Sequence, residues 1–211
     1  DGIGVEVMQE VLNIINWMIK NKSISFDISE RLVGGAAYDK EGDSISDSTM
    51  DEALNADAVL FGAVGGSNWD NVERAKRPEA ALLRLRKELD LFANLRPAVV
   101  FDALANSSSL KLDVVKGLDI LILRELTSGV YFGQPRGIEK ISDSEEKAVD
   151  TQSYTTSEVT RIGKVAFDLA KKRDNKVTSV EKSNVMETGM FWRNIITALH
   201  RNEFSEVNLD H

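Results

Sequence analysis

The chain contains no cysteine, which excludes disulfide bonds, thiolate metal sites and a cysteine nucleophile. It also has no apolar run as long as a membrane-spanning helix requires, and it shows no signal peptide. Only two histidines are present, His200 and His211, and their spacing does not suit a metal site. We therefore expect a cytoplasmic protein that does not enter a membrane.

Basic residues are in the minority, with 26 Lys and Arg against 34 Asp and Glu and a net charge of −8. Nucleic-acid binding needs a basic face that neutralises phosphates, so nucleic acid is not the expected partner. A small anionic substrate remains compatible, because it responds to local rather than net charge. The 211 residues, 42% of them hydrophobic, suffice for one large domain or for parts of two.

The hydrophobic pattern predicts helices alternating with strands. Helices are expected over 7–18, 47–56, 78–90, 156–169 and 185–202, with Asp47 or Ser48 capping the second and Thr156 the fourth. Strands are expected over 24–28, 58–61, 97–101, 118–123, 176–181 and 206–209, the second and fourth of them buried. Residues 131–154 alternate without a helical period, which indicates a hairpin arm. This order predicts an α/β fold with a largely parallel sheet.

Two glycine-rich segments lie at 1–4 and 62–66, but neither matches G-x-G-x-x-G. No acidic residue follows them at the spacing of a Rossmann site, so a bound dinucleotide would not use that fingerprint. A glycine loop at the first residue lacks the strand that should precede it, and a strand-like stretch stops at His211. We therefore expect the chain to be incomplete at both ends.

The helix that begins at Pro78 places Glu79, Leu82, Leu83 and Arg86 on one face, at i, i+3, i+4 and i+7. A core stripe would not begin with Glu and end with Arg. Spacing alone still favours an ordinary helix, in which two charges flank a leucine pair and reach solvent.

Three further polar residues stand at places where α/β proteins bind ligands. Arg124 ends an apolar strand, where an arginine can fork onto a carboxylate. Tyr131 lies between glycines and could donate a proton if a neighbouring cation lowers its pKa. Lys182 ends another strand and could act as a base if burial or a cation depresses its pKa. For Arg124 a local ion pair is an equal explanation. For Tyr131 a structural role is favoured, and for Lys182 a solvated position at the strand end.

Together these segments resemble the isopropylmalate/isocitrate dehydrogenase family along nearly the whole chain. The matching strings are, in order, DGIG…EV, VGGAA, GAVGG…WD, RPE..LL.LRK…LFANLRP, RELT.G.YFG.PRG, DT..YT..E..RI…AF, SVEKSNV and FWR. A set in this order is highly specific, and it favours a shared site containing Arg86, Arg96, Arg124, Tyr131 and Lys182. Val5 departs from the pattern, because the family commonly has proline after DGIG.

The resemblance implies a two-domain α/β sandwich with an extended intersubunit arm, truncated in this chain. Residues 1–91 would form the first domain, an incomplete part of the cofactor-binding domain. Residues 92–211 would form the substrate and dimer domain, incomplete at its carboxyl end, with the arm at about 131–154. It also implies a homodimer with shared active sites, in which the partner chain contributes Lys182, Asn184 and Val185.

The resemblance further implies NAD as cofactor, Mg²⁺ or Mn²⁺ as metal, and 3-isopropylmalate as the substrate to be oxidised and decarboxylated for leucine biosynthesis. The arginines would hold the carboxylates, Lys182 would assist removal of the hydroxyl proton, and Tyr131 would protonate the enol. The remaining roles are contact with the substrate for Glu79, Leu82, Leu83 and Val185, and contact with the cofactor for Ile3 and Asn184. The metal-binding aspartates of the family are expected beyond His211, so no metal ligand is named here.

Two alternatives remain beside this interpretation. One is a related β-decarboxylating dehydrogenase of the isocitrate, homoisocitrate or tartrate type. The other is a non-catalytic or regulatory chain with the same fold, although all five polar site residues are intact. A generic α/β binding domain would explain the periodicity but not the set of motifs.

Overall fold

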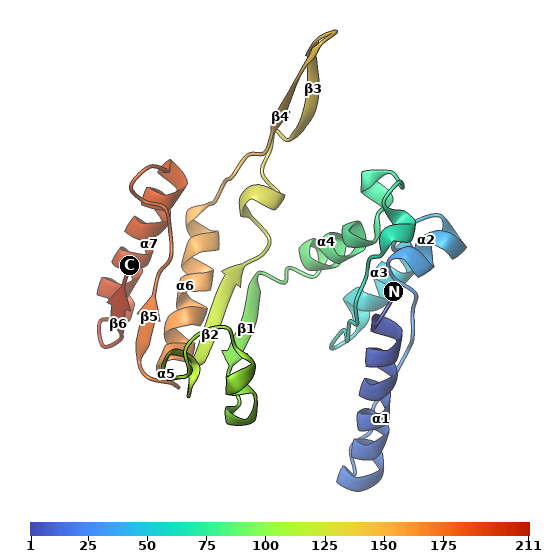
Figure 1. Cartoon of the computed structure of the whole chain (residues 1–211), viewed down its shortest axis with the longest axis horizontal. Helices are drawn as coiled ribbons and strands as arrows, with labels where there is room; N and C mark the ends of the chain where they lie inside the picture. The colour runs from blue at the N-terminus through green and yellow to red at the C-terminus, as the bar shows by residue number, and fades with distance from the viewer. The chain divides into compact units, whose positions relative to one another are not determined.

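Seven α-helices and six strands follow one another along the chain (Figure 1). The computed structural model describes all 211 residues, which group into two units, Asp1–Asp90 and Leu91–His211. The boundary lies one residue before the predicted one, while the roles assigned to the two parts stay predictions. None of the helices combines the length and the apolar composition needed to cross a membrane.

The first unit contains four α-helices: α1 (Gly4–Lys22), α2 (Gly35–Glu41), α3 (Asp47–Asn55) and α4 (Pro78–Glu88). Pro78 occupies the first turn of α4, as predicted, because its fixed φ suits a helix start. The predicted cap of α3 is wrong by one or two residues. Ser46 caps it, because its extended backbone lets its hydroxyl accept from the amide of Thr49 at 3.4 Å.

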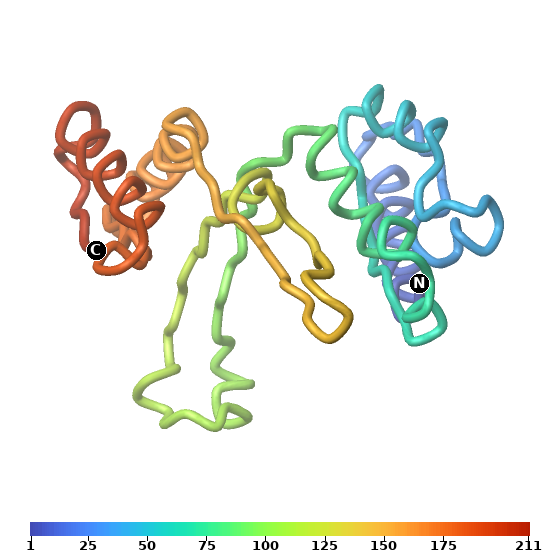
Figure 2. Tube along the Cα trace, turned by 90° about the horizontal axis from the view of Figure 1, so that it is seen from above, coloured from blue at the N-terminus to red at the C-terminus, as the bar shows by residue number.

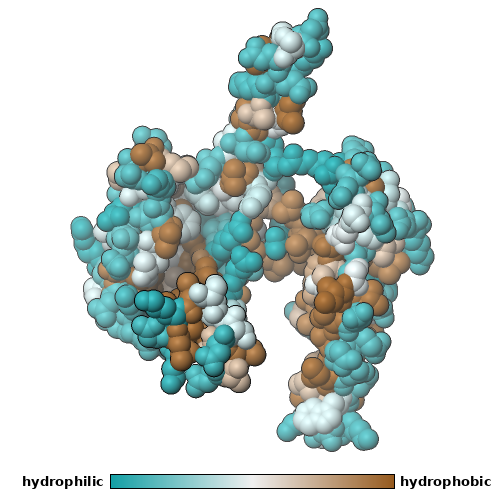
Figure 3. Space-filling model, viewed as in Figure 1, coloured by the Kyte–Doolittle hydropathy of each residue, from teal (hydrophilic) through white to brown (hydrophobic).

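A small core holds α3 and α4 together. Ile45, Met50, Ala81 and Leu85 are buried there, at 4% exposure or less. α1 contributes little to this core, because Gly4 is its only buried residue. Apolar side chains along α1 therefore remain exposed (Figure 3).

Two predicted strands of the first unit, 24–28 and 58–61, are absent. Both segments lack regular structure, and neither pairs with another strand. Their apolar residues are correspondingly exposed, with Phe26 at 46% and Leu60 at 60%. A strand needs a neighbour for its backbone N–H and C=O groups, and alternation in sequence does not supply one.

The second unit contains three two-stranded sheets. β1 (Ala93–Val99) pairs antiparallel with β2 (Asp119–Glu125), and the two run side by side in Figure 2. β3 (Gly137–Ser142) pairs antiparallel with β4 (Glu145–Val149), and β5 (Lys176–Thr178) pairs parallel with β6 (Asn208–Asp210). The largely parallel sheet predicted from the alternation is therefore wrong for these residues, because only one of the three pairs is parallel.

The strands of this unit lie where predicted, with shifted ends. β2 was expected to be buried, but Ile120 and Ile122 are 50% and 52% exposed, because one face of its two-stranded sheet has no cover. A short helix, α5 (Leu112–Val115), lies in the connection from β1 to β2.

Helices α6 (Thr156–Ala170) and α7 (Glu187–Glu203) form the main core of the unit. Phe167 is fully buried and stacks on Phe204 with ring centroids 5.0 Å apart. Thr155, one residue before the predicted cap, caps α6. Its hydroxyl accepts from the amide of Glu158 at 3.4 Å, and the Glu158 carboxylate accepts from the Thr155 amide at 2.7 Å. This reciprocal pair is a capping box.

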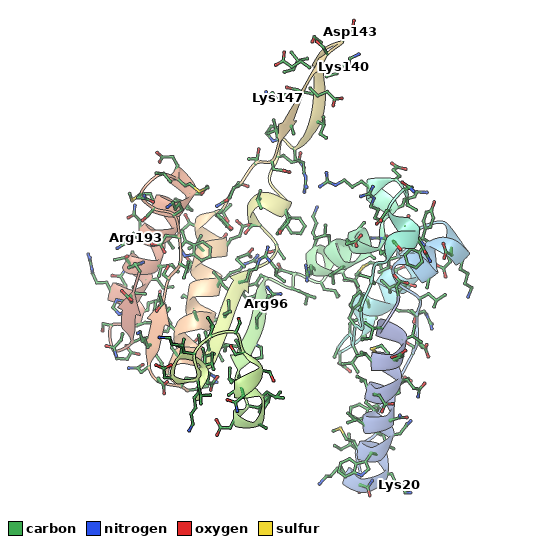
Figure 4. All side chains as sticks on the ribbon, in the orientation of Figure 1. Lys20, Arg96, Lys140, Asp143, Lys147 and Arg193 are labelled. Carbon is green, nitrogen blue, oxygen red and sulfur yellow. The ribbon has the colours of Figure 1, made fainter.

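The β3–β4 hairpin confirms the predicted hairpin within 131–154 and projects from the rest of its unit (Figure 1). Its side chains are almost all exposed (Figure 4). They form two ion pairs, Lys140 with Asp143 and Lys147 with Glu139. Whether it contacts a second subunit stays a prediction.

Candidate active site

A pocket of ≈ 370 Å³ in the second unit has three of the predicted site residues in its wall: Arg124, Tyr131 and Lys182. Its other walls come from the turn after β2, the segment that precedes α6, the segment that follows β5 and the first turns of α7. The family resemblance implied that Lys182 comes from the partner chain, whereas here Lys182 shares a pocket with Arg124 and Tyr131 of its own chain. Side chains far apart in sequence thus meet in one cavity.

Arg96 and Arg124 lie on the same face of the β1–β2 pair. Arg124 is opposite Asn94, and Arg96 is opposite Ile122, so the two arginines are diagonal neighbours across the strands. Such neighbours lie about 7–8 Å apart, within reach of long side chains. Arg96, labelled in Figure 4, is exposed and is not part of the pocket wall.

Arg124 also contacts Tyr131. The guanidinium carbon of Arg124 lies 5.1 Å from the centroid of the Tyr131 ring, in a cation–π arrangement. Tyr131 ends a 3-10 turn, η4 (Gly129–Tyr131), and its backbone carbonyl accepts a hydrogen bond from Arg136. Its side chain is half exposed, so a ligand in the pocket can reach it.

Gly129 is required at the start of this turn. Its φ of +80° lies in the left-handed region, and an added Cβ would stand 2.6 Å from the hydroxyl of Tyr154. Tyr154 is itself part of the pocket wall and packs edge-to-face on Trp192, with centroids 5.3 Å apart. Burial, together with the negative charge of Glu125, raises the pKa of the Tyr154 phenol. The phenol therefore stays protonated in the pocket near neutral pH.

Lys182 follows β5 in a segment that is held against α7. An added Cβ at Gly189 would lie 2.5 Å from the carbonyl carbon of Lys182, so the helix backbone touches the Lys182 backbone. The buried Glu181 carboxylate accepts from Ser179 at 2.8 Å and from Arg193 at 3.2 Å. These contacts hold the backbone, while the Lys182 side chain remains exposed.

Asn184 and Val185 follow Lys182 but are not among the residues of the pocket wall. Val185 is 71% exposed. Their predicted contacts with cofactor and substrate therefore stay predictions.

The remaining predicted residues belong to the first unit. The buried side of α4 contains Ala81 and Leu85, whereas Leu82 and Leu83 are only half buried. The leucine pair is therefore not the core stripe of its helix. Glu79 on the same helix is exposed, Arg86 is half buried, and Ile3 is 68% exposed.

Asp1 is a structural residue that the sequence interpretation missed. Its carboxylate accepts from the amides of Gly35 at 2.7 Å, Ala36 at 2.9 Å and Gly65 at 3.2 Å. An added Cβ at Gly4 would stand 2.7 Å from the Ala63 backbone nitrogen. The strings DGIG, VGGAA and GAVGG thus meet around one carboxylate, and an added Cβ at Gly34 would clash with it.

Glu125 was also missed, although it follows Arg124 directly in the string RELT. Burial alone would raise the pKa of its carboxyl. Hydrogen bonds from Ser128, Arg161 and Thr127 outweigh burial and hold this pKa below its ordinary value. An acidic residue beside a predicted binding arginine was the signal that could have identified it.

The structure contains no group of three or more His, Asp or Glu side chains that could hold a metal ion. The chain also has no cysteine. The residues described here therefore do not fit a metal centre by themselves, and no chemical step is assigned to one.

Comparisons with known proteins agree with the strings found in the sequence. A family model described as isocitrate/isopropylmalate dehydrogenase matches residues 1–211. The chain is 56% identical to a 3-isopropylmalate dehydrogenase of Pelagibacter ubique and 60% identical to one of Rhodopseudomonas palustris. Both matches cover 100% of this chain and 57% of the relative, so the chain spans less than two thirds of the curated relatives' length.

Solved structures give the same result for the fold. A β-decarboxylating dehydrogenase of Thermococcus kodakarensis matches with a TM-score of 0.66 at 27% identity, over 100% of this chain and 54% of that one. An isocitrate dehydrogenase of Methylococcus capsulatus matches with a TM-score of 0.75 at 24% identity, over 100% and 57%, and supports the fold alone. The family model covers the whole chain, and the chain therefore belongs to the isocitrate/isopropylmalate dehydrogenase family.

Proposed function

We propose that this chain belongs to an enzyme that oxidises and decarboxylates 3-isopropylmalate to 2-oxo-4-methylpentanoate, a step of leucine biosynthesis. The observation that favours this substrate most is the identity of 54–60% to curated 3-isopropylmalate dehydrogenases over all 211 residues. The pocket that contains Arg124, Tyr131 and Lys182 supplies side chains suited to such chemistry.

The proposed site residues have different roles in the reaction. Arg124, with Arg96 on the same strand face, offers planar donors for a substrate carboxylate. Lys182, contributed by the second chain of the proposed dimer, assists removal of the proton from the substrate hydroxyl. Tyr131, in contact with the Arg124 cation, donates a proton to the carbon from which carbon dioxide has left.

Substrate preference within the family is assigned to the leucine pair of α4. Leu82 and Leu83 are half buried and lie outside the core stripe, which leaves their apolar surface available for an isopropyl group. A third carboxylate, as in isocitrate, would lose hydration against these apolar side chains, which cannot donate hydrogen bonds to it. An unpaired buried polar group costs about 2–7 kcal/mol, and the lower figure corresponds to about a 30-fold loss of affinity.

The family points to a pyridine nucleotide and a divalent metal, and the proposal specifies NAD and either Mg²⁺ or Mn²⁺. NAD accepts the hydride when it is bound. Ile3 in the first glycine segment and Asn184 after Lys182 are the residues proposed to contact it. No residue of this chain is assigned to the metal.

A homodimer and a cytoplasmic location complete the proposal. The β3–β4 hairpin supports the dimer, because an isolated two-stranded hairpin is at best marginally stable and Ile138, on its surface, is 71% exposed. In that dimer Lys182, Asn184 and Val185 act in the partner's site. Lys182 also lies in the wall of the pocket of its own chain.

A substrate panel tests the proposal. The protein is purified as its gene encodes it, and the formation of NADH and carbon dioxide is measured with 3-isopropylmalate, isocitrate, homoisocitrate and tartrate. We expect kcat/KM for 3-isopropylmalate to exceed that for isocitrate by at least about 30-fold. A preference for another of these acids would reassign the substrate, and no turnover of any of them would favour the non-catalytic chain.

A further inference from the structure

Glu125 is a buried carboxylate in the wall of the pocket, and the proposed chemistry does not use it. It is the last residue of β2, and its side chain is 1% exposed. One carboxylate oxygen accepts from the amides of Thr127 and Ser128 at 2.8 and 2.9 Å and from the Ser128 hydroxyl at 2.6 Å. The other accepts from the Thr127 hydroxyl at 3.0 Å and from Arg161 at 2.7 Å.

These five hydrogen bonds fix the turn that joins two of the pocket residues. Arg124 precedes Glu125 directly, and Tyr131 follows at the end of η4. The amides of Thr127 and Ser128 are bound to the carboxylate, so the direction in which the chain leaves β2 is set by Glu125. The Glu125 turn, residues 125–128, therefore determines where Arg124 and Tyr131 lie relative to each other.

Arg161 ties this turn to the rest of the unit. It lies on α6 and also donates to the Thr127 hydroxyl. Its guanidinium carbon stands 4.5 Å from the centroid of the Phe92 ring, and the Phe92 carbonyl accepts from the amide of Leu126 at 2.9 Å. The start of β1, the end of β2 and α6 thus meet at the Glu125–Arg161 pair.

We propose that Glu125 is a positioning residue, which holds Arg124 and Tyr131 in the arrangement that the reaction needs. It acts through these two residues, because its side chain is 1% exposed and protein donors occupy both of its oxygens. This role rests on the proposed function of the pocket. A neutral side chain cannot replace the carboxylate, because five donors converge on its two oxygens.

Glu125→Gln is the direct test. The single remaining oxygen must face the amides of Thr127 and Ser128, which can only donate, and the new NH₂ group then faces Arg161. The ion pair between residue 125 and Arg161 is lost, while the size of the side chain is kept. A displacement of about 1 Å in a catalytic group can lower the rate about 100-fold, and we expect kcat/KM to fall by about that factor.

Asp119→Asn provides the matched control. Asp119 stands at the opposite end of β2 and binds Arg173 at 2.8 Å, but its side chain is 56% exposed and lies outside the pocket wall. This variant also removes an Asp–Arg pair from the same strand, and we expect kcat/KM to stay unchanged. An equal loss in both variants would overturn the proposal, because it would reflect general damage to β2.

A double-mutant cycle with Tyr131→Phe separates positioning from a structural role. If Glu125 acts through Tyr131, Glu125→Gln lowers kcat much less in the Tyr131→Phe background than in the wild type. Equal losses in the two backgrounds would contradict the proposal.

Amide hydrogen exchange gives a readout that does not need turnover. We expect exchange at residues 127–131 to be faster in Glu125→Gln and unchanged in Asp119→Asn. If Glu125→Gln does not fold, Thr127→Val removes one of the five donors and is expected to show a smaller acceleration. If the wild type turns over no substrate, the proposed function fails. Amide exchange then shows by itself whether Glu125 orders the turn. Unchanged exchange in both Glu125→Gln and Thr127→Val would refute the proposal that Glu125 orders this turn.

Discussion

Replacement of Gly189 with alanine should displace the backbone that carries Lys182. The added Cβ would stand 2.5 Å from both the carbonyl carbon and the carbonyl oxygen of Lys182, and 2.8 Å from the amide nitrogen of Ser183. Ordinary carbon contacts lie at about 3.5–4.0 Å, so one of the two segments must move by about 1 Å. The obstacle is backbone on both sides, which cannot rotate away as a side-chain end can.

The expected change in the free energy of unfolding is the sum of two opposing effects. Alanine in place of glycine in a helix gains up to about 1 kcal/mol. Overpacking of a close contact costs about 1–3 kcal/mol, so the free energy of unfolding should fall by up to about 2 kcal/mol. Because Lys182 moves with its backbone, kcat should fall by more than the loss of folded protein explains, up to about 100-fold for a 1 Å displacement.

Gly163→Ala on α6 is the control. Its Cβ would stand 2.8 Å from the terminal methyl carbons of Ile196 and Leu199, which are ends of rotatable side chains. Urea unfolding and steady-state kinetics are measured for both variants. We expect a smaller loss of stability and an unchanged kcat for Gly163→Ala. Wild-type stability together with wild-type kcat in Gly189→Ala would refute the contact between α7 and the Lys182 backbone.

Three further predictions concern other parts of the chain. Thr155→Ala removes the hydroxyl of the α6 capping box, and the free energy of unfolding in urea should fall by about 1 kcal/mol. Because the folded state lowers the pKa of Glu125 below 4.5, its ion pair stabilises the protein above that pH, and stability is lost as the pH falls through the folded pKa. The stability of Glu125→Gln should therefore depend less on pH below about 4.5, and parallel curves for the two proteins would contradict this. Substituting Leu82 and Leu83 with serine should lower kcat/KM for 3-isopropylmalate far more than for tartrate, and an unchanged value would remove the leucine pair from the substrate site.

The sequence predicted some elements from local signals and missed others. Pro78 marked the start of α4, and the alternation around 131–154 marked the β3–β4 hairpin. The segments 24–28 and 58–61 alternate or run apolar like strands, yet they have no hydrogen-bonding neighbour. Pairing is a property of the partner segment, so no local pattern could have revealed its absence.

The candidate site was likewise predicted only in part. Arg124, Tyr131 and Lys182 were predicted from strand ends, glycines and the family strings, and they line one pocket. Glu125 was not predicted, because its importance depends on donors at Thr127, Ser128 and, on another helix, Arg161. Its place beside Arg124 could have pointed to it, but the five hydrogen bonds that indicate its role are seen only in the structure.

The most direct test of the account is the kinetics of Tyr131→Phe with 3-isopropylmalate. The phenylalanine ring keeps the contact with Arg124 but cannot donate a proton. We expect kcat to fall by about 100-fold or more while KM changes little, because general acid catalysis contributes about 10²–10⁴-fold. A large rise in KM with an unchanged kcat would contradict the role of Tyr131 as proton donor, and with it the assignment of this pocket to the reaction.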